Sequence, residues 1–147
     1  MAHPSSPDPH DLQRFVDAQA ADYDRACQEL VAGLKRTHWI WYIFPQMRGL
    51  GRSPTAQVYG IASRAEAVAY LAHPVLGPCL VHCTQLMLAV EGRPLDAIMP
   101  FPDNLKFVSS MTLFAATAPD PALFTAALDK FAAGQPDAAT LELLRQS

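Results

Sequence analysis

Apolar residues recur at intervals of three and four along most of this chain, and proline or glycine interrupts each run. This spacing places the apolar side chains on one face of an α-helix, so it predicts a succession of amphipathic helices. Thirteen prolines divide that succession into pieces of unequal length. We therefore predict an all-α, compact single domain of six to eight helices that is not a simple bundle. Residues 11–147 are expected to form the domain, and residues 1–10 a disordered N-terminal tail.

Local signals predict where some helices begin and end. Ser63 and Glu66 match a capping box, which predicts a helix that ends near Ala72. The preceding segment, residues 46–62, is the least helical part of the chain because it holds three glycines and a proline. We expect it to be irregular, with at most one brief strand over residues 57–61.

Two further helix starts depend on short polar side chains. Thr37 is the expected N-cap of a short, largely apolar helix over residues 38–44, and Asp103 or Asn104 is the expected N-cap of a later one. Residues 11–34 show the helical spacing throughout, which fits either one long helix or two shorter ones.

The composition narrows the class of protein. Half of the residues are hydrophobic and 17% are charged, which is typical of a packed globular domain. A net charge of −3 gives no overall attraction to nucleic acid, so none is expected as a partner. No apolar run approaches the roughly 18 residues of a membrane span. Three cysteines without a framework spacing favour a reducing cytoplasm.

The most informative stretch is residues 38–54, where an aromatic block is followed by a glycine-spaced loop with two arginines. His38, Trp41 and Tyr42 have the spacing of one helical face. Trp41 and Tyr42, and Tyr59 further on, could stack against a flat ring, and His38 could transfer a proton near neutral pH. Trp39, Ile40, Ile43 and Phe44 are expected to be core residues, and the alternative for His38 is a half-buried structural histidine.

The loop has the residue types of an anion site. Backbone amides freed by glycine, together with arginine side chains, bind phosphate or carboxylate groups. The spacing is neither a P-loop nor a dinucleotide fingerprint, so an ordinary surface loop stays open as an alternative. The loop residues predicted to bind the ligand are Gln46, Arg48, Gly49, Gly51, Arg52 and Ser53.

A third group lies on the helix that starts near Asp103. Steps of 100° per residue place Asp103, Lys106 and Ser110 in one narrow stripe, with Ser109 further round. Lys106 and Ser110 are candidate catalytic residues, and Asp103 and Ser109 candidate ligand-binding residues. The alternative is that Asp103 caps the helix and pairs with Lys106.

Metal binding is not expected. Cys79 and Cys83 have the i, i+4 spacing of two ligands on a helix, and His82 lies beside them, but no further ligand is near. Cys83 also falls on the apolar stripe, so core packing is the favoured interpretation. No cofactor motif is present.

Several segments in the same order resemble one bacterial family of unknown function. The resemblance implies a compact, mainly helical single domain and no established reaction. It covers most of the chain from about residue 11 to 144, although members usually carry glycine where Pro102 stands. The matching segments are residues 14–19, 38–46, 49–53, 59–61, 73–77 and 106–114.

The leading hypothesis is a cleft for a small anionic ligand, such as a nucleotide or an ADP-ribose derivative. Positioning, charge stabilisation and one acid–base group would suffice for hydrolysis of a glycosidic or phosphate-linked bond if the protein is an enzyme. The alternative is a non-enzymatic interaction module that presents an exposed surface of aromatic residues and arginines to another protein. The first hypothesis requires a concave site and the second a flat or convex one.

Overall fold

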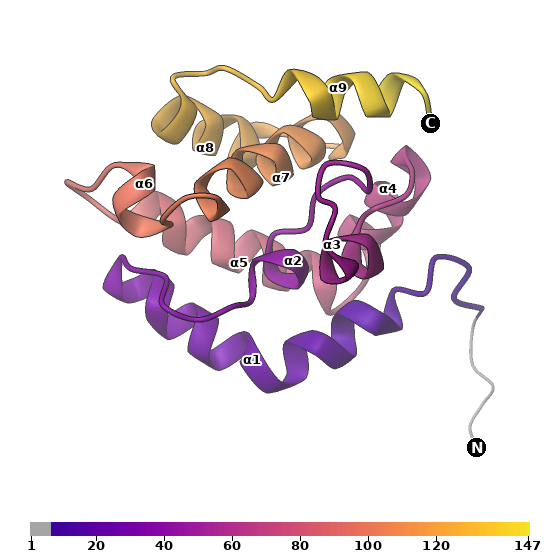
Figure 1. Cartoon of the computed structure of the whole chain (residues 1–147), viewed down its shortest axis with the longest axis horizontal. Coiled ribbons are helices and arrows are strands. Elements are labelled where there is room, and N and C mark those ends of the chain that lie inside the picture. The colour runs from indigo at the N-terminus through magenta and orange to yellow at the C-terminus, as the bar shows by residue number, and fades with distance from the viewer. Residues whose placement is uncertain (1–6) are drawn as a thin grey trace.

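The computed structural model describes residues 7–147, so residues 1–6 of the predicted tail lie outside the described residues. In the described part the fold is all-α, as predicted, and forms a compact single domain (Figure 1). The helices in chain order are α1 (Gln13–Ala32), α2 (Ile40–Ile43), α3 (Pro54–Tyr59), α4 (Arg64–Ala72), α5 (Leu76–Ala89), α6 (Leu95–Ile98), α7 (Asp103–Thr117), α8 (Ala122–Ala132) and α9 (Ala138–Arg145).

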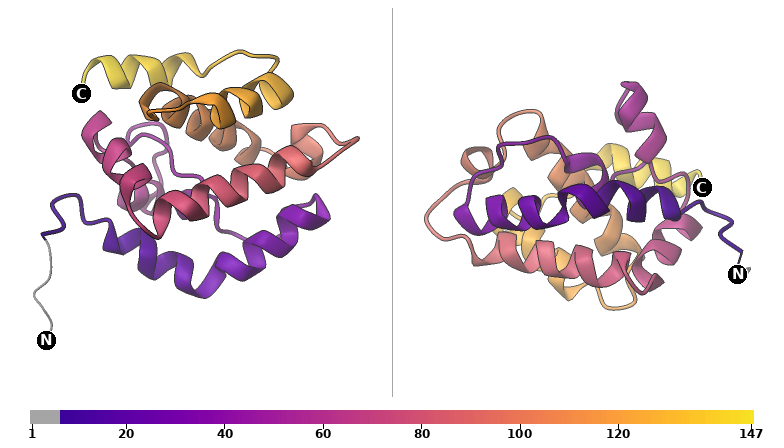
Figure 2. Two further views of the ribbon diagram at one scale, coloured as in Figure 1. Left: turned by 180° about the vertical axis from the view of Figure 1, so that it is seen from behind. Right: turned by 90° about the horizontal axis from the view of Figure 1, so that it is seen from below.

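Helix α5 lies at the centre of the molecule. It packs against α1 on one side and α8 on the other, and α4 packs near its start (Figures 1 and 2). Helix α7 packs against α8 and α9 and also contacts α2. It therefore connects the two sides of the site that is described below. The arrangement differs from a simple bundle since the helices range from 4 to 20 residues in length.

The core is formed where the apolar faces of these helices meet. Its largest fully buried side chains are Phe15, Leu30, Trp39, Ile40, Ile43, Phe44, Ile61, Tyr70, Leu76, Leu80, Phe107 and Phe114. Aromatic rings contact one another across elements, as in the edge-to-face pair Phe44–Phe107, whose centroids are 5.0 Å apart. Burial of Trp39 and Cys83 confirms that both are core residues.

The capping box is present as predicted. Ser63 Oγ accepts a hydrogen bond of 3.1 Å from the Glu66 amide, and α4 ends at Ala72. Residues 13–32 form one continuous helix, α1, which bends near its middle (Figures 1 and 2). One helix, not two, therefore occupies that segment.

Two predicted N-caps are wrong, because in both cases the polar side chain bonds to a buried charged residue and not to the helix. Helix α2 begins at Ile40, and the Thr37 hydroxyl instead donates to the Glu29 carboxylate at 2.7 Å. Helix α7 begins at Asp103 without a side-chain cap, and the Asp103 carboxylate pairs with Lys35 Nζ at 2.6 Å.

The segment 46–62 is more ordered than predicted, and residues 7–147 contain nine helices where six to eight were expected. Ser53 Oγ accepts a hydrogen bond of 3.1 Å from the Ala56 amide, and Pro54 occupies the first turn, so the two residues start α3. The expected strand over 57–61 is therefore wrong. Within the described residues the β-pairing is an isolated bridge between Met47 and Ile61.

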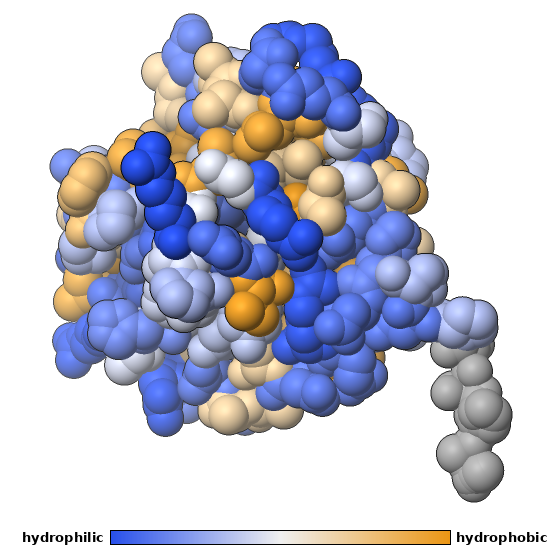
Figure 3. Space-filling view, turned by 45° about the vertical axis from the view of Figure 1, so that its right-hand side comes forward, coloured by the Kyte–Doolittle hydropathy of each residue, from blue (hydrophilic) through white to orange (hydrophobic). Residues whose placement is uncertain are grey.

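The described part of the predicted tail, residues 7–10, contacts the start of α1. Asp8 accepts hydrogen bonds from the amides of Leu12 and Gln13 at 2.8 and 3.0 Å. On the face nearest this segment hydrophilic surface predominates, and apolar residues form separate patches (Figure 3). No single helix in residues 7–147 is long and apolar enough to cross a membrane, although the bent pair α4–α5 would meet that test by length and composition together.

Candidate functional site

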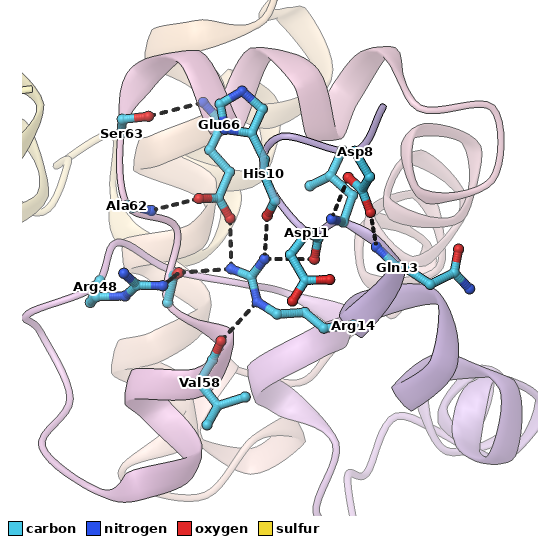
Figure 4. A network of polar contacts seen from close by, with 12 residues as sticks. Asp8, His10, Asp11, Gln13, Arg14, Arg48, Val58, Ala62, Ser63 and Glu66 are labelled. Carbon is cyan, nitrogen blue, oxygen red and sulfur yellow. Dashed lines mark hydrogen bonds and ion pairs between the residues drawn. The ribbon is translucent and has the colours of Figure 1, made fainter. Parts of the chain in front are cut away.

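Arg14 and Arg48 flank one hollow, of about 420 Å³, beside the N-terminal segment. Figure 4 shows that the Arg14 guanidinium points inward and is surrounded by acceptors. Its five hydrogen bonds, of 2.6–3.1 Å, go to the backbone oxygens of His10, Asp11, Val58 and Gly60 and to Oε2 of Glu66. A guanidinium has five N–H donors, so Arg14 has none left for a ligand. We interpret this cluster as structural.

The predicted aromatic wall is divided between different parts of the core. Trp39 donates its indole N–H to the Glu29 carboxylate at 3.0 Å. Tyr42 donates to the Asp22 carboxylate, and its ring lies 5.3 Å from that of Tyr59. Burial and the bond to Asp22 raise the pKa of the Tyr42 hydroxyl. Tyr42 therefore belongs to the core, and Tyr59 is partly buried against it, with its ring 5.9 Å from that of Phe15 on α1.

Four of the predicted site residues do meet in a second hollow, of about 230 Å³, which we call the Lys106 hollow. Three stretches far apart in sequence form it: the loop after α2, the first half of α7, and the residue that starts α9. The lining residues are Gln46, Leu50, Gly51, Pro102, Leu105, Lys106, Ser109 and Asp137.

Lys106 supplies the positive charge of this hollow. Its Nζ lies 5.1 Å from the centre of the Trp41 ring and 3.8 Å from Asp103 Oδ1. Asp103 is itself held at 2.6 Å by the buried ammonium of Lys35. Asp103 is thus shared by two lysines, of which Lys35 is the nearer, and the Lys106 ammonium donates no hydrogen bond to any residue within 7–147.

Gln46 and Gly51 form the facing wall. A Cβ at Gly51 would lie 2.6 Å from the Ala56 Cβ and 3.4 Å from Gln46 Nε2, so this position has no room for a side chain. The amides of Gly49 and Gly51 donate no backbone hydrogen bond within residues 7–147. Gly49 has a φ of +108°, which side-chain-bearing residues rarely adopt. Of the two glycines, Gly51 lines the hollow, so one unpaired amide lies at this wall beside the Gln46 side chain.

Ser109 and Asp137 close the hollow at the start of α9. Asp137 Oδ2 accepts hydrogen bonds from Ser109 Oγ at 3.2 Å, from the Thr140 amide at 3.1 Å and from the Thr140 hydroxyl at 2.5 Å. Oδ1 accepts none from the described residues. Asp137 therefore fixes α9 against α7 with one oxygen and leaves the other as an acceptor.

The remaining predicted site residues lie elsewhere. His38 and Arg52 are exposed and line neither the Lys106 hollow nor the one beside Arg14. The Ser53 hydroxyl is used as the cap of α3. Ser110 is 0% exposed, so its side chain faces the core and not a ligand. Trp41, half-buried, contributes its ring to Lys106 and not to a flat wall.

Sequence reasoning missed two charged residues of this site. Lys35 is buried beside Asp103, and no local pattern distinguishes it from a surface lysine. Asp137 begins the last helix by accepting from the Thr140 amide, so its local sequence signal is that of an N-cap. Its place in the Lys106 hollow depends on how α9 packs against α7, which the sequence near it does not specify.

Comparisons with known proteins agree with this fold. A solved structure, described as the crystal structure of the conserved hypothetical protein Rv1873 from Mycobacterium tuberculosis, is 51% identical in sequence and superposes with a TM-score of 0.93. The match covers 94% of this chain and 99% of that one. No curated protein matches at a significant level. The family model described as protein of unknown function, DUF1810, matches residues 9–144, and the chain therefore belongs to that family.

Proposed function

We propose that this protein binds a small molecule with an anionic head group in the Lys106 hollow. The observation that carries the proposal is the half-buried ammonium of Lys106, whose side chain is 22% exposed and which makes no hydrogen bond within residues 7–147. A cation held against a tryptophan ring, in a hollow that also contains the unpaired Gly51 amide, is well placed to bind phosphate or carboxylate.

The size of the hollow limits what it can enclose. At about 230 Å³ it is smaller than the roughly 300–1,000 Å³ of sites that bury a drug-sized ligand. A phosphate with one sugar ring suits this space, whereas a nucleotide or ADP-ribose would place only part of its length inside. Gln46 and Asp137 Oδ1 would then contact sugar hydroxyls, and Leu50 and Leu105 the apolar face of the ring.

We propose that the hollow binds a ligand, and we propose no reaction there. We expect the protein to be cytoplasmic. His38 and Ser110, two of the predicted catalytic residues, do not line the hollow. Lys106 does line the hollow, and its position supports a role in binding the anionic head group of the ligand. The interaction-module alternative is less favoured, because Tyr42 belongs to the core and the rings of Trp41 and Tyr59 are partly buried against it.

The test is a thermal unfolding series with inorganic phosphate, ribose 5-phosphate, AMP and ADP-ribose. A ligand at a hundred times its dissociation constant should stabilise the protein by about 2.7 kcal/mol. We expect ribose 5-phosphate to raise the melting temperature of the wild type and of Arg52→Met, and to leave Lys106→Met unchanged.

Arg52→Met is the matched control because it also removes one positive charge, from an exposed residue outside the hollow. Equal responses of the two variants would show that binding does not involve Lys106 and would refute the proposed site. Absence of any response by the wild type across the series would refute the ligand class.

A further inference from the structure

A third hollow, of about 320 Å³, lies between α1 and the start of α5. It shares no residue with the Lys106 hollow. Its walls are mostly apolar, and its lining contains no lysine or arginine. The lining residues are Val16, Gln19, Ala20, Tyr23, Asp24, Val75 and Cys79. We call it the Gln19 hollow.

Gln19 is the unusual residue in this wall. It lies on the apolar stripe of α1 and is only 4% exposed. Its Nε2 donates to the Tyr42 carbonyl at 2.7 Å and to the Tyr70 hydroxyl at 3.1 Å, so both N–H groups are used and the amide orientation is fixed. Its Oε1 is buried and has no hydrogen-bond partner among the described residues. Buried acceptors of this kind are normally paired.

The other polar groups around the hollow are neutral or acidic. Tyr23 lies among the free thiols of Cys27, Cys79 and Cys83, and burial raises the pKa of the Tyr23 hydroxyl and of the Cys79 thiol. Asp24 is the one charged residue in the lining. This environment repels anions and favours a ligand that donates a hydrogen bond.

We propose that the Gln19 hollow binds a small, largely apolar molecule that presents an N–H or O–H donor to Gln19 Oε1. The apolar walls would contact the body of the molecule, and the donor would satisfy the buried Gln19 acceptor that is unpaired among the described residues. This site is independent of the anion site proposed above, because neither its residues nor its ligand chemistry overlap.

Indole and indene are suitable probes, because they have closely similar bicyclic skeletons and only indole carries an N–H donor. We expect indole, titrated to millimolar concentration, to shift the side-chain amide signals of Gln19 in ¹H–¹⁵N spectra. Because the hydrogen bond is made only by indole, indene should bind roughly tenfold more weakly.

Two variants locate the site. Ala20→Trp would fill the hollow from an exposed position of α1 and should abolish the response to indole. Ala21→Trp adds the same ring at the neighbouring exposed position, which does not line the hollow, and should leave the response intact. Equal affinity for indole and indene, no binding of indole by the wild type, or unchanged binding by Ala20→Trp would each overturn the proposal.

Discussion

Trp39 donates its indole N–H to the carboxylate of Glu29 at 3.0 Å, and this bond anchors the loop between α1 and α2 in the core. The same carboxylate accepts hydrogen bonds from the amides of Arg36 and Thr37, at 2.7 and 3.0 Å. The buried Glu29 on α1 thus fixes the start of α2, the helix that places the Trp41 ring against Lys106.

Glu29 should make folding stability depend on pH in acid. Burial alone would raise the pKa of this carboxyl, but the hydrogen bonds from Thr37, Arg36 and Trp39 outweigh it and lower the pKa from 4.5 to about 2. The stabilisation, about 3 kcal/mol, is therefore complete above about pH 4.5 and is lost as the pH falls toward 2. Urea unfolding at pH 7, 4.5 and 3 measures it.

Glu29→Gln should be less stable at pH 7 and should show a flatter decline in acid. Glu91→Gln, at an exposed glutamate, is the control and should follow the wild-type curve. If the wild type and Glu29→Gln lose stability in parallel below pH 4.5, then Glu29 is not the group that titrates.

The ion pair between Arg14 and Glu66, 2.7 Å apart, should be sensitive to removal of one partner because both side chains are largely buried. Arg14→Met leaves the Glu66 carboxylate without its cation, and we expect a loss of about 3 kcal/mol. Adding Glu66→Gln should restore part of it, since no buried charge then remains. Arg25→Met, at an exposed pair, should cost about 0–1 kcal/mol in the same denaturant assay. Additive effects of the two core substitutions would contradict this account.

Gly77 should resist replacement although it lies within a helix. Alanine normally stabilises a helix interior relative to glycine by about 1 kcal/mol. Here the new Cβ would lie 2.2 Å from the Leu71 carbonyl oxygen, where α4 meets α5. We expect Gly77→Ala to cost about 2–3 kcal/mol. Gly92→Ala meets open space at a φ of +73° and should cost only about 1 kcal/mol. A gain in melting temperature for Gly77→Ala would show that the two helices can separate easily.

His73 should act as a cap for the central helix. Its Nδ1 accepts hydrogen bonds from the amides of Val75 and Leu76 at 3.1 and 3.2 Å. His73→Ala removes both acceptors and should cost about 1 kcal/mol, whereas His73→Asp supplies a carboxylate in their place and should recover most of it. Thermal unfolding at pH 7 compares the three proteins. Equal losses in both variants would indicate that ring packing, and not the acceptor, matters at this position.

The glycines and polar residues in the segments that resemble the family have mainly structural roles. Gly51, Gly60 and Gly77 each lie where a Cβ would clash, and Arg14 and Gln19 bond to backbone or buried groups. Many of the residues that carry the resemblance to the family therefore maintain the fold, and only some of them line the Lys106 hollow.

The sequence by itself determined the features that depend on neighbours along the chain. Apolar spacing predicted the helices, and the Ser63–Glu66 pair predicted where α4 starts, because these interactions act within one or two helical turns. Only the tertiary structure decided which polar groups meet. The side chains of Thr37 and Asp103 do not cap the nearby helices but bond to Glu29 and Lys35. Lys106, Gln46 and Asp137 come together from three elements. These contacts form because burial makes an unpaired polar group costly, and burial depends on packing between distant segments that local sequence does not encode.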